Sequence, residues 1–84
     1  MMEIRLQFGS LKLKLSIHTK GDARLYLRVA ASHVDKGGVQ AIDYKCKCTP
    51  RELAESIGRH NKLQPATLDC LTDAVELLLK YSGM

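Results

Sequence analysis

The sequence predicts an α+β fold in which a four-stranded antiparallel β-meander is followed by two helices packed on one sheet face, in the order ββββαα. Three observations support this order. Apolar and polar residues alternate from the N-terminus, glycine-containing turns interrupt the alternation, and apolar residues recur at helical spacing after residue 49. We expect one domain over residues 1–84, with the antiparallel sheet in residues 1–48 and a helix-turn-helix in residues 49–83.

The expected strands share one apolar face. Side chains in a strand alternate between the two faces, so every second residue points the same way. Four runs of such residues form this face: Ile4, Leu6 and Phe8; Leu11, Leu13, Leu15 and Ile17; Leu25, Leu27, Val29 and Ala31; and Ile42, Tyr44, Cys46 and Cys48.

Glycines mark the three expected turns. The two-residue loop Gly9-Ser10 suits a type II′ hairpin turn and places Phe8 opposite Leu11. The connection at residues 20–22 includes a glycine and is expected to place Ile17 opposite Leu25. The third turn is expected around residues 35–38, where paired glycines permit a tight reversal that sets Ala31 against Ile42, Val29 against Tyr44 and Leu27 against Cys46.

The opposite face of the expected sheet is cationic. Only Glu3 and Asp43 dilute it, and Tyr26 lies between two arginines, an arrangement that favours stacking with bases or sugars but is also ordinary in strands. The residues expected to contact nucleic acid are Arg5, Lys12, Lys14, Arg24, Tyr26, Arg28, Lys45 and Lys47.

The positive charge is concentrated in the sheet half. The chain has a formal net charge of +4, and residues 1–49 contain nine Lys and Arg against four Asp and Glu. Residues 50–84 contain four basic and five acidic residues. Such an imbalance favours a polyanionic partner, nucleic acid first, although a solubilising role or an acidic protein partner gives the same pattern.

Two helices are expected in the second half. The segment Thr49-Pro50-Arg51-Glu52 is typical of a helix start with a capping box. This helix is expected to end at His60-Asn61, with Asn61 suited to a left-handed cap. Pro65 begins a longer helix that is apolar over a wide arc, to which Cys70 and Leu77 contribute, and Gly83 closes it.

Residues 51–79 resemble the N-terminal helix-turn-helix of the bacterial HU/IHF histone-like proteins. The shared features are the acidic-Leu pair Glu52-Leu53, Ile57, Leu63 just before the second helix, and Asp73-Ala74-Val75. The resemblance implies a bacterial or phage protein and a homodimer whose helices interlock. The implied dimer interface consists of Leu53, Ile57, Leu68, Leu71, Val75 and Leu78. In that family the DNA-gripping sheet follows the helices, so no DNA-binding residue is transferred to this chain.

No catalytic motif stands out, and we expect a protein that is not an enzyme and needs no cofactor or metal. Cys46 and Cys48 are expected to be buried small hydrophobes, because no further ligands stand at a metal-finger spacing. Three cysteines and no apolar run near 18 residues favour a reduced, cytoplasmic location without a membrane span.

The expected function is therefore nucleic-acid binding by the basic sheet face, largely independent of sequence, with DNA favoured over RNA. The alternative is a protein-interaction module, such as a phage or mobile-element inhibitor or adaptor that docks its basic face on an acidic protein.

Overall fold

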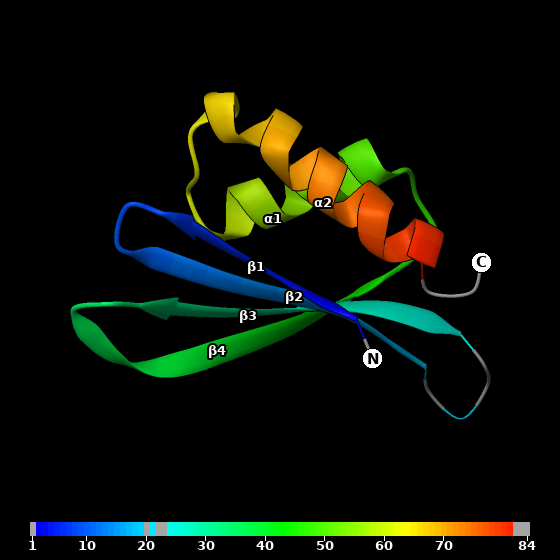
Figure 1. Cartoon of the computed structure of the whole chain (residues 1–84), viewed down its shortest axis with the longest axis horizontal. Helices are drawn as coiled ribbons and strands as arrows, with labels where there is room; N and C mark the ends of the chain where they lie inside the picture. Colours follow the sequence, from blue (N-terminus) through cyan, green and yellow to red (C-terminus); the bar gives the residue numbers. More distant parts are fainter. Residues whose placement is uncertain (1, 20, 22–23, 82–84) are drawn as a thin grey trace.

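A computed structural model describes residues 2–19, 21 and 24–81, and it has the α+β architecture that the sequence predicts. Strands β1 (Glu3–Phe8), β2 (Leu11–Thr19), β3 (Leu25–His33) and β4 (Lys36–Lys45) form one antiparallel sheet in the order β1-β2-β3-β4. Helix α1 (Pro50–His60), a 3₁₀ turn (Pro65–Thr67) and helix α2 (Leu68–Tyr81) follow. Both helices lie on the same side of the sheet (Figure 1).

The first hairpin has the expected register. Phe8 lies opposite Leu11, Leu6 opposite Leu13 and Ile4 opposite Leu15. Gly9 has a φ of 61°, which the first position of a two-residue hairpin turn requires and which glycine adopts without steric cost.

The other two expected registers are wrong by two residues. Leu27, not Leu25, lies opposite Ile17, because Thr19 at the end of β2 pairs with Leu25 and the connection is therefore two residues longer than expected. Ile42, not Tyr44, lies opposite Val29. The expected turn at residues 20–22 falls partly outside the described residues. A displacement of two residues leaves every side chain on the face that the alternation assigns to it, because strand side chains repeat with a period of two.

The third turn also differs from expectation. Val34 and Asp35 form the turn, and residues 36–38 already belong to β4. His33 pairs with Lys36 and Ser32 pairs with Val39, so the two glycines between them occupy an irregularity of the ladder. Gly38 has a φ of 96°, which explains why glycine suits this bulge-like position.

The fourth strand starts earlier and ends earlier than expected. It ends at Lys45, so Cys46 and Cys48 follow the strand. Cys46 is half-buried against the core, but Cys48 is exposed, which corrects the expectation that both are buried. Cys70 and Leu77 are also exposed, so the buried arc of α2 is narrower than the sequence indicates.

The core lies between the helices and strands β1 to β3. Its largest fully buried side chains are Leu13, Leu15, Leu27, Leu53, Ile57, Leu71, Val75 and Leu78. Strand β4 extends beyond this cover, and nearly all of its residues are exposed. Ile42, although it faces the helix side of the sheet, is 40% exposed.

Capping interactions define both ends of α1. Thr49 Oγ1 accepts a hydrogen bond from the Glu52 amide at 3.2 Å, and Glu52 Oε1 accepts one from the Thr49 amide at 3.2 Å, which confirms the capping box. At the other end, the left-handed residue is Lys62, with a φ of 55°, and not Asn61. The amide of Leu63 donates to the carbonyl of Gly58 at 2.9 Å, as in a Schellman motif.

The residues expected at a dimer interface are used within one chain. Leu53, Ile57, Leu71, Val75 and Leu78 are at most 2% exposed, and Leu68 is half-buried against the same core. Five of these six side chains are thus already enclosed within one chain, and their role in a dimer interface stays a prediction. Among the described residues, no helix is both long and apolar enough to cross a membrane.

Candidate nucleic-acid interface

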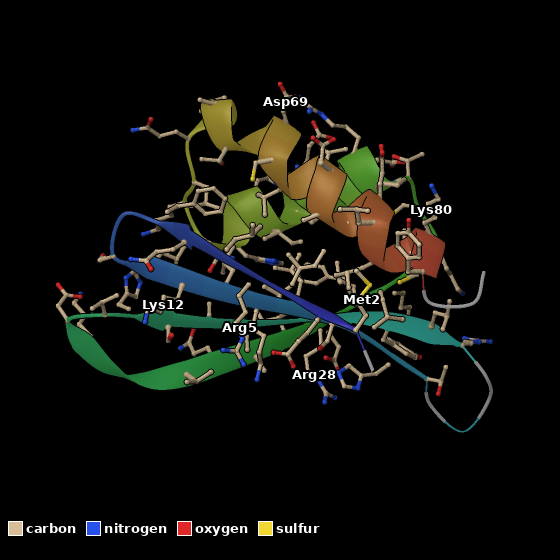
Figure 2. The ribbon with its side chains drawn as sticks, in the orientation of Figure 1. Met2, Arg5, Lys12, Arg28, Asp69 and Lys80 are labelled. Atoms are coloured by element: carbon tan, nitrogen blue, oxygen red, sulfur yellow. The ribbon has the colours of Figure 1, made fainter. Side chains whose placement is uncertain are left out.

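The sheet face that points away from the helices, called the outer face, carries the basic side chains. Figure 2 shows Arg5, Lys12 and Arg28 on this side, whereas Asp69 and Lys80 belong to the helix layer. The alternation of β1, β2, β3 and β4 therefore places the expected residues of the strands on a common surface, despite the corrected registers, while Arg24 and Lys47 lie just beyond β3 and β4. The surface is divided into two basic patches and a belt between them.

The Lys12 patch consists of Arg5, Lys12 and Lys14. Arg5 on β1 lies directly opposite Lys14 on β2, and Lys12 follows two residues away on the same face. All three line a hollow of about 460 Å³, to which Ala30 and Ser32 on β3 also contribute. The small side chains of β3 leave room beside the long cations, so the patch is concave.

Within the Lys12 patch, the cations differ in their partners. Arg5 Nε donates to Glu3 Oε2 at 3.1 Å, but the Arg5 side chain is 79% exposed, and exposed ion pairs contribute little to stability. Lys12 and Lys14 form no ion pair within the described part of the chain. Both ammonium groups are therefore available to an anion.

A neutral belt crosses the middle of the outer face. Arg28 on β3 lies opposite Asp43 on β4 and donates two hydrogen bonds to its carboxylate, from Nε at 2.9 Å and from Nη2 at 3.2 Å. These hydrogen bonds and the adjacent negative charge raise the pKa of Arg28. On its other side Arg28 lies opposite Ser16, which is buried and bonded to His18 at 2.8 Å. The positive charge of Arg28 is thus balanced by Asp43, whereas Lys12 and Lys14 form no such pair in the described part of the chain.

The Lys45 patch lies beyond the belt and consists of Arg24, Tyr26, Lys45 and Lys47. Tyr26 lies opposite Lys45 in the β3–β4 ladder and opposite His18 in the β2–β3 ladder. The four residues line a hollow of about 300 Å³ together with Leu25 and Cys46. The aromatic ring is half-buried between basic neighbours, which suits a base or sugar packed beside a bound phosphate.

Several contributors to this surface were missed from the sequence. Asp43 was recognised as diluting the basic face, but its direct pairing with Arg28 depends on a register two residues away from the expected one. Ala30 and Ser32 were not singled out, although small residues on the polar side of an alternating strand can signal a hollow. Val39, which is 69% exposed, also borders that hollow.

The cysteines and histidines do not assemble a metal site within the described part of the chain, where no three His, Cys, Asp or Glu side chains lie close enough to hold an ion. Burial, followed by the proximity of Cys48, raises the pKa of the Cys46 thiol, which disfavours its nucleophilic thiolate form. His60 hydrogen-bonds through Nδ1 to the Tyr44 hydroxyl at 2.5 Å.

Comparisons of the chain with known protein families, with curated proteins and with solved structures found no match. The functional assignment therefore depends on the geometry of the outer face.

Proposed function

We propose that this protein is a small, non-enzymatic nucleic-acid-binding protein that contacts phosphates through the Lys12 and Lys45 patches. Binding is largely independent of sequence, the protein acts in the cytoplasm, and DNA is favoured over RNA through the resemblance to HU/IHF proteins. A homodimer is part of the proposal, because a domain of 84 residues has limited capacity to stabilise itself by burial alone.

The single observation that carries the proposal is the Lys12 patch itself. Like charges directly opposite each other in a sheet are destabilising, yet Arg5 and Lys14 occupy such positions with Lys12 beside them. An anion bound in the hollow that these three residues line would remove the repulsion. Phosphate groups form strong, charge-assisted hydrogen bonds with Arg and Lys side chains.

The two patches together favour a polymer over a small anion. Ala30, opposite Lys14, and Tyr26, opposite Lys45, are four residues apart on β3. This separation corresponds to about 13 Å along the strand. A chain of phosphates can contact both patches at once, whereas a single inorganic anion contacts only one of them. The neutral belt between them limits the number of phosphates that the face can bind.

The deciding experiment measures DNA affinity as a function of salt concentration. We expect the double substitution Lys12→Ala/Lys14→Ala to weaken binding to duplex DNA and to lower the magnitude of the slope of log K against log [salt] by about two. Each phosphate that loses its lysine contact keeps about one counterion on the DNA instead of releasing it. Single-stranded DNA and RNA of the same length are measured in parallel.

The matched control is Arg51→Ala/Lys80→Ala, which removes two positive charges from the helix layer. Arg51 pairs with Asp69 at 2.9 Å on the exposed surface, so its loss has little effect on stability. The control should retain the slope of the parent protein. An unchanged slope in the Lys12/Lys14 variant, or an absence of binding to all three nucleic acids at low salt, contradicts the proposal.

A second function is supported by the apolar border of the Lys12 patch. Val39 on β4 is strongly exposed beside three cations, and a mixed apolar and basic surface also suits an acidic protein. In this case the chain acts as an inhibitor or adaptor. A protein partner that stays bound after nuclease treatment, and is lost in the Lys12/Lys14 variant, favours this alternative.

A further inference from the structure

A third basic hollow, called the cleft, lies largely on the helix side of the sheet, between the β3–β4 hairpin and the end of α1. Its volume is about 530 Å³, which is within the range of small-molecule sites. The β1–β2 and β3–β4 turns lie at the same end of the sheet, next to the segment that leaves α1 (Figure 1). The cleft is therefore assembled from three separate parts of the chain.

The cleft is lined by cationic side chains and by hydrogen-bond donors. His33 and Lys36 come from the hairpin, and His60, Asn61 and Lys62 come from the end of α1. No acidic side chain lines it among the described residues, and Lys36 and Lys62 form no ion pair there. The nearest acid along the chain, Asp35, lies in the exposed turn beside Lys36. An anion in the cleft would meet positive charge from two sides.

Lys62 occupies a position that its side chain makes unfavourable. Its φ of 55° is the left-handed conformation that closes the Schellman motif of α1, where glycine is the usual residue. A lysine there is strained relative to glycine. Residues with a strained backbone are often found at ligand-binding sites. Lys62 lines the cleft and supplies an ammonium group, which a glycine at this position would not.

The remaining walls supply further donors. Gly37 and Gly38 line the cleft, and a Cβ at either position would meet nothing within 4 Å, so their backbone is open to a ligand. His60 accepts or donates through Nδ1 to the Tyr44 hydroxyl. When Tyr44 donates, the neutral imidazole carries its hydrogen on Nε2, which makes that nitrogen a donor.

We propose that this cleft binds a phosphate group, held by Lys36 and Lys62 from opposite sides. The phosphate belongs either to a free small phosphate ester or to a nucleic-acid chain that continues from the outer face. Ser32 and Val39 line both this cleft and the hollow of the Lys12 patch, but the two open on opposite faces of the sheet, so a bound chain has to pass around the β3–β4 hairpin to reach both. The site goes beyond the proposed function, since a free ester could bind there without any nucleic acid on the outer face.

The test is an NMR titration of the whole chain in a phosphate-free buffer. The probes are inorganic phosphate, a nucleoside monophosphate and a short single-stranded oligonucleotide. We expect the amide signals of His33, Lys36, Gly38 and Lys62 to shift with at least one of them. An absence of shifts at these residues with all three probes, up to about 20 mM for the two small ones, overturns the proposal.

Lys62→Gly is the most informative variant because its two expected effects have opposite directions. Glycine relieves the backbone strain, so the melting temperature should rise, while loss of the ammonium group should weaken phosphate binding at least fivefold. A binding loss caused by unfolding cannot accompany a higher melting temperature. The matched control, Lys80→Ala on α2, should leave binding unchanged. Unchanged binding in Lys62→Gly overturns the proposal.

The Lys12→Ala/Lys14→Ala background identifies the source of the phosphate. If free esters shift the cleft signals equally in this background, the cleft is an independent site. If only the oligonucleotide shifts them, and does so only with Lys12 and Lys14 present, the phosphate comes from a chain bound on the outer face. Failure of the cleft with retained salt-dependent DNA binding rejects this site while leaving the proposed function intact.

Discussion

Arg28 and Asp43 lie directly opposite each other on β3 and β4, and the guanidinium donates two hydrogen bonds to the carboxylate across the outer face. This pair divides a surface that would otherwise be continuously basic. It also brings a negative charge into the proposed path of the phosphates. Its removal should therefore alter nucleic-acid binding as directly as the removal of a lysine.

Substitution of Asp43 with Asn should strengthen nucleic-acid binding. The change removes the negative charge from the belt and releases Arg28 from its ion pair, so one more cation becomes available to a phosphate. We expect affinity for duplex DNA to rise several-fold at low salt and the salt slope to steepen by up to about one. Fluorescence anisotropy over a range of salt concentrations measures both quantities.

The control for this substitution is Glu76→Gln, which removes one negative charge from the exposed surface of α2. It changes the net charge equally but leaves the outer face untouched. If both variants bind DNA equally well, net charge and not the belt determines affinity, and the proposed division of the outer face is incorrect.

Truncation of apolar side chains on the helix side of the sheet should have strongly unequal effects in the central strand β2 and in the edge strand β4. Leu15 on β2 is fully buried, so Leu15→Ala should lower the free energy of unfolding by about 2–5 kcal/mol. Ile42 on β4 is only partly covered, and Ile42→Ala should cost less than about 1 kcal/mol. Urea unfolding followed by circular dichroism gives both values, and similar losses would show that β4 is covered in solution.

The contribution of the α1 capping box to the free energy of unfolding should be measurable by single substitutions at Thr49. Thr49→Ala removes the hydroxyl that accepts the Glu52 amide, which should lower the free energy of unfolding by about 0.5–2 kcal/mol. Thr49→Ser retains the accepting oxygen and should stay close to the parent in the same urea experiment. Equal losses in the two variants would assign the effect to the lost methyl group.

The three cysteines should react with iodoacetamide in a defined order. Burial raises the pKa of Cys46, so at any pH below that value it has less thiolate than an unperturbed thiol. Cys48 and Cys70 are exposed and should be alkylated first near pH 8, as followed by mass spectrometry of peptides. In concentrated urea the difference should vanish.

Because its folded-state pKa is raised, the stability that Cys46 contributes is present below its ordinary pKa of 9.0 and is lost as the pH rises through the folded value.

The sequence was sufficient to predict the elements and the faces of the sheet, because these depend on local periodicity. Ile4, Leu13 and Val29 face the helices, as the alternation indicates, and Thr49 caps α1 as its capping box predicts. The register of a strand pair depends on contacts between the two strands, and the residues of the connecting turn specify it only weakly. Both incorrect registers differ by two residues, the smallest displacement that keeps the apolar face intact.

Charge pairing across the strands could have corrected both registers. The expected alignment placed Lys14 opposite Arg28 and Arg28 opposite Lys45, two like-charged pairs that destabilise a sheet. The observed alignment places Arg28 between Ser16 and Asp43. The polar face therefore contained information about the register that the apolar face lacked.

The candidate site was predicted only in part. All eight expected residues lie on the outer face or line its hollows, but the division into two patches follows from the pairing of Arg28 with Asp43. The cleft beside Lys62 was not foreseen, because glycine pairs suggested a turn and the left-handed residue was expected one position earlier, at Asn61. Such tertiary junctions have no local signature.

Because β4 is exposed on both sides, this edge strand should open locally more easily than the covered centre of the sheet. Amide hydrogens of β2, flanked by strands and covered by helices, should exchange with solvent only through global opening, whereas those of β4 should exchange through local fraying. Since β4 carries Asp43 and Lys45, we expect this local opening to alter the proposed phosphate-binding surface while the packing around β2 is retained.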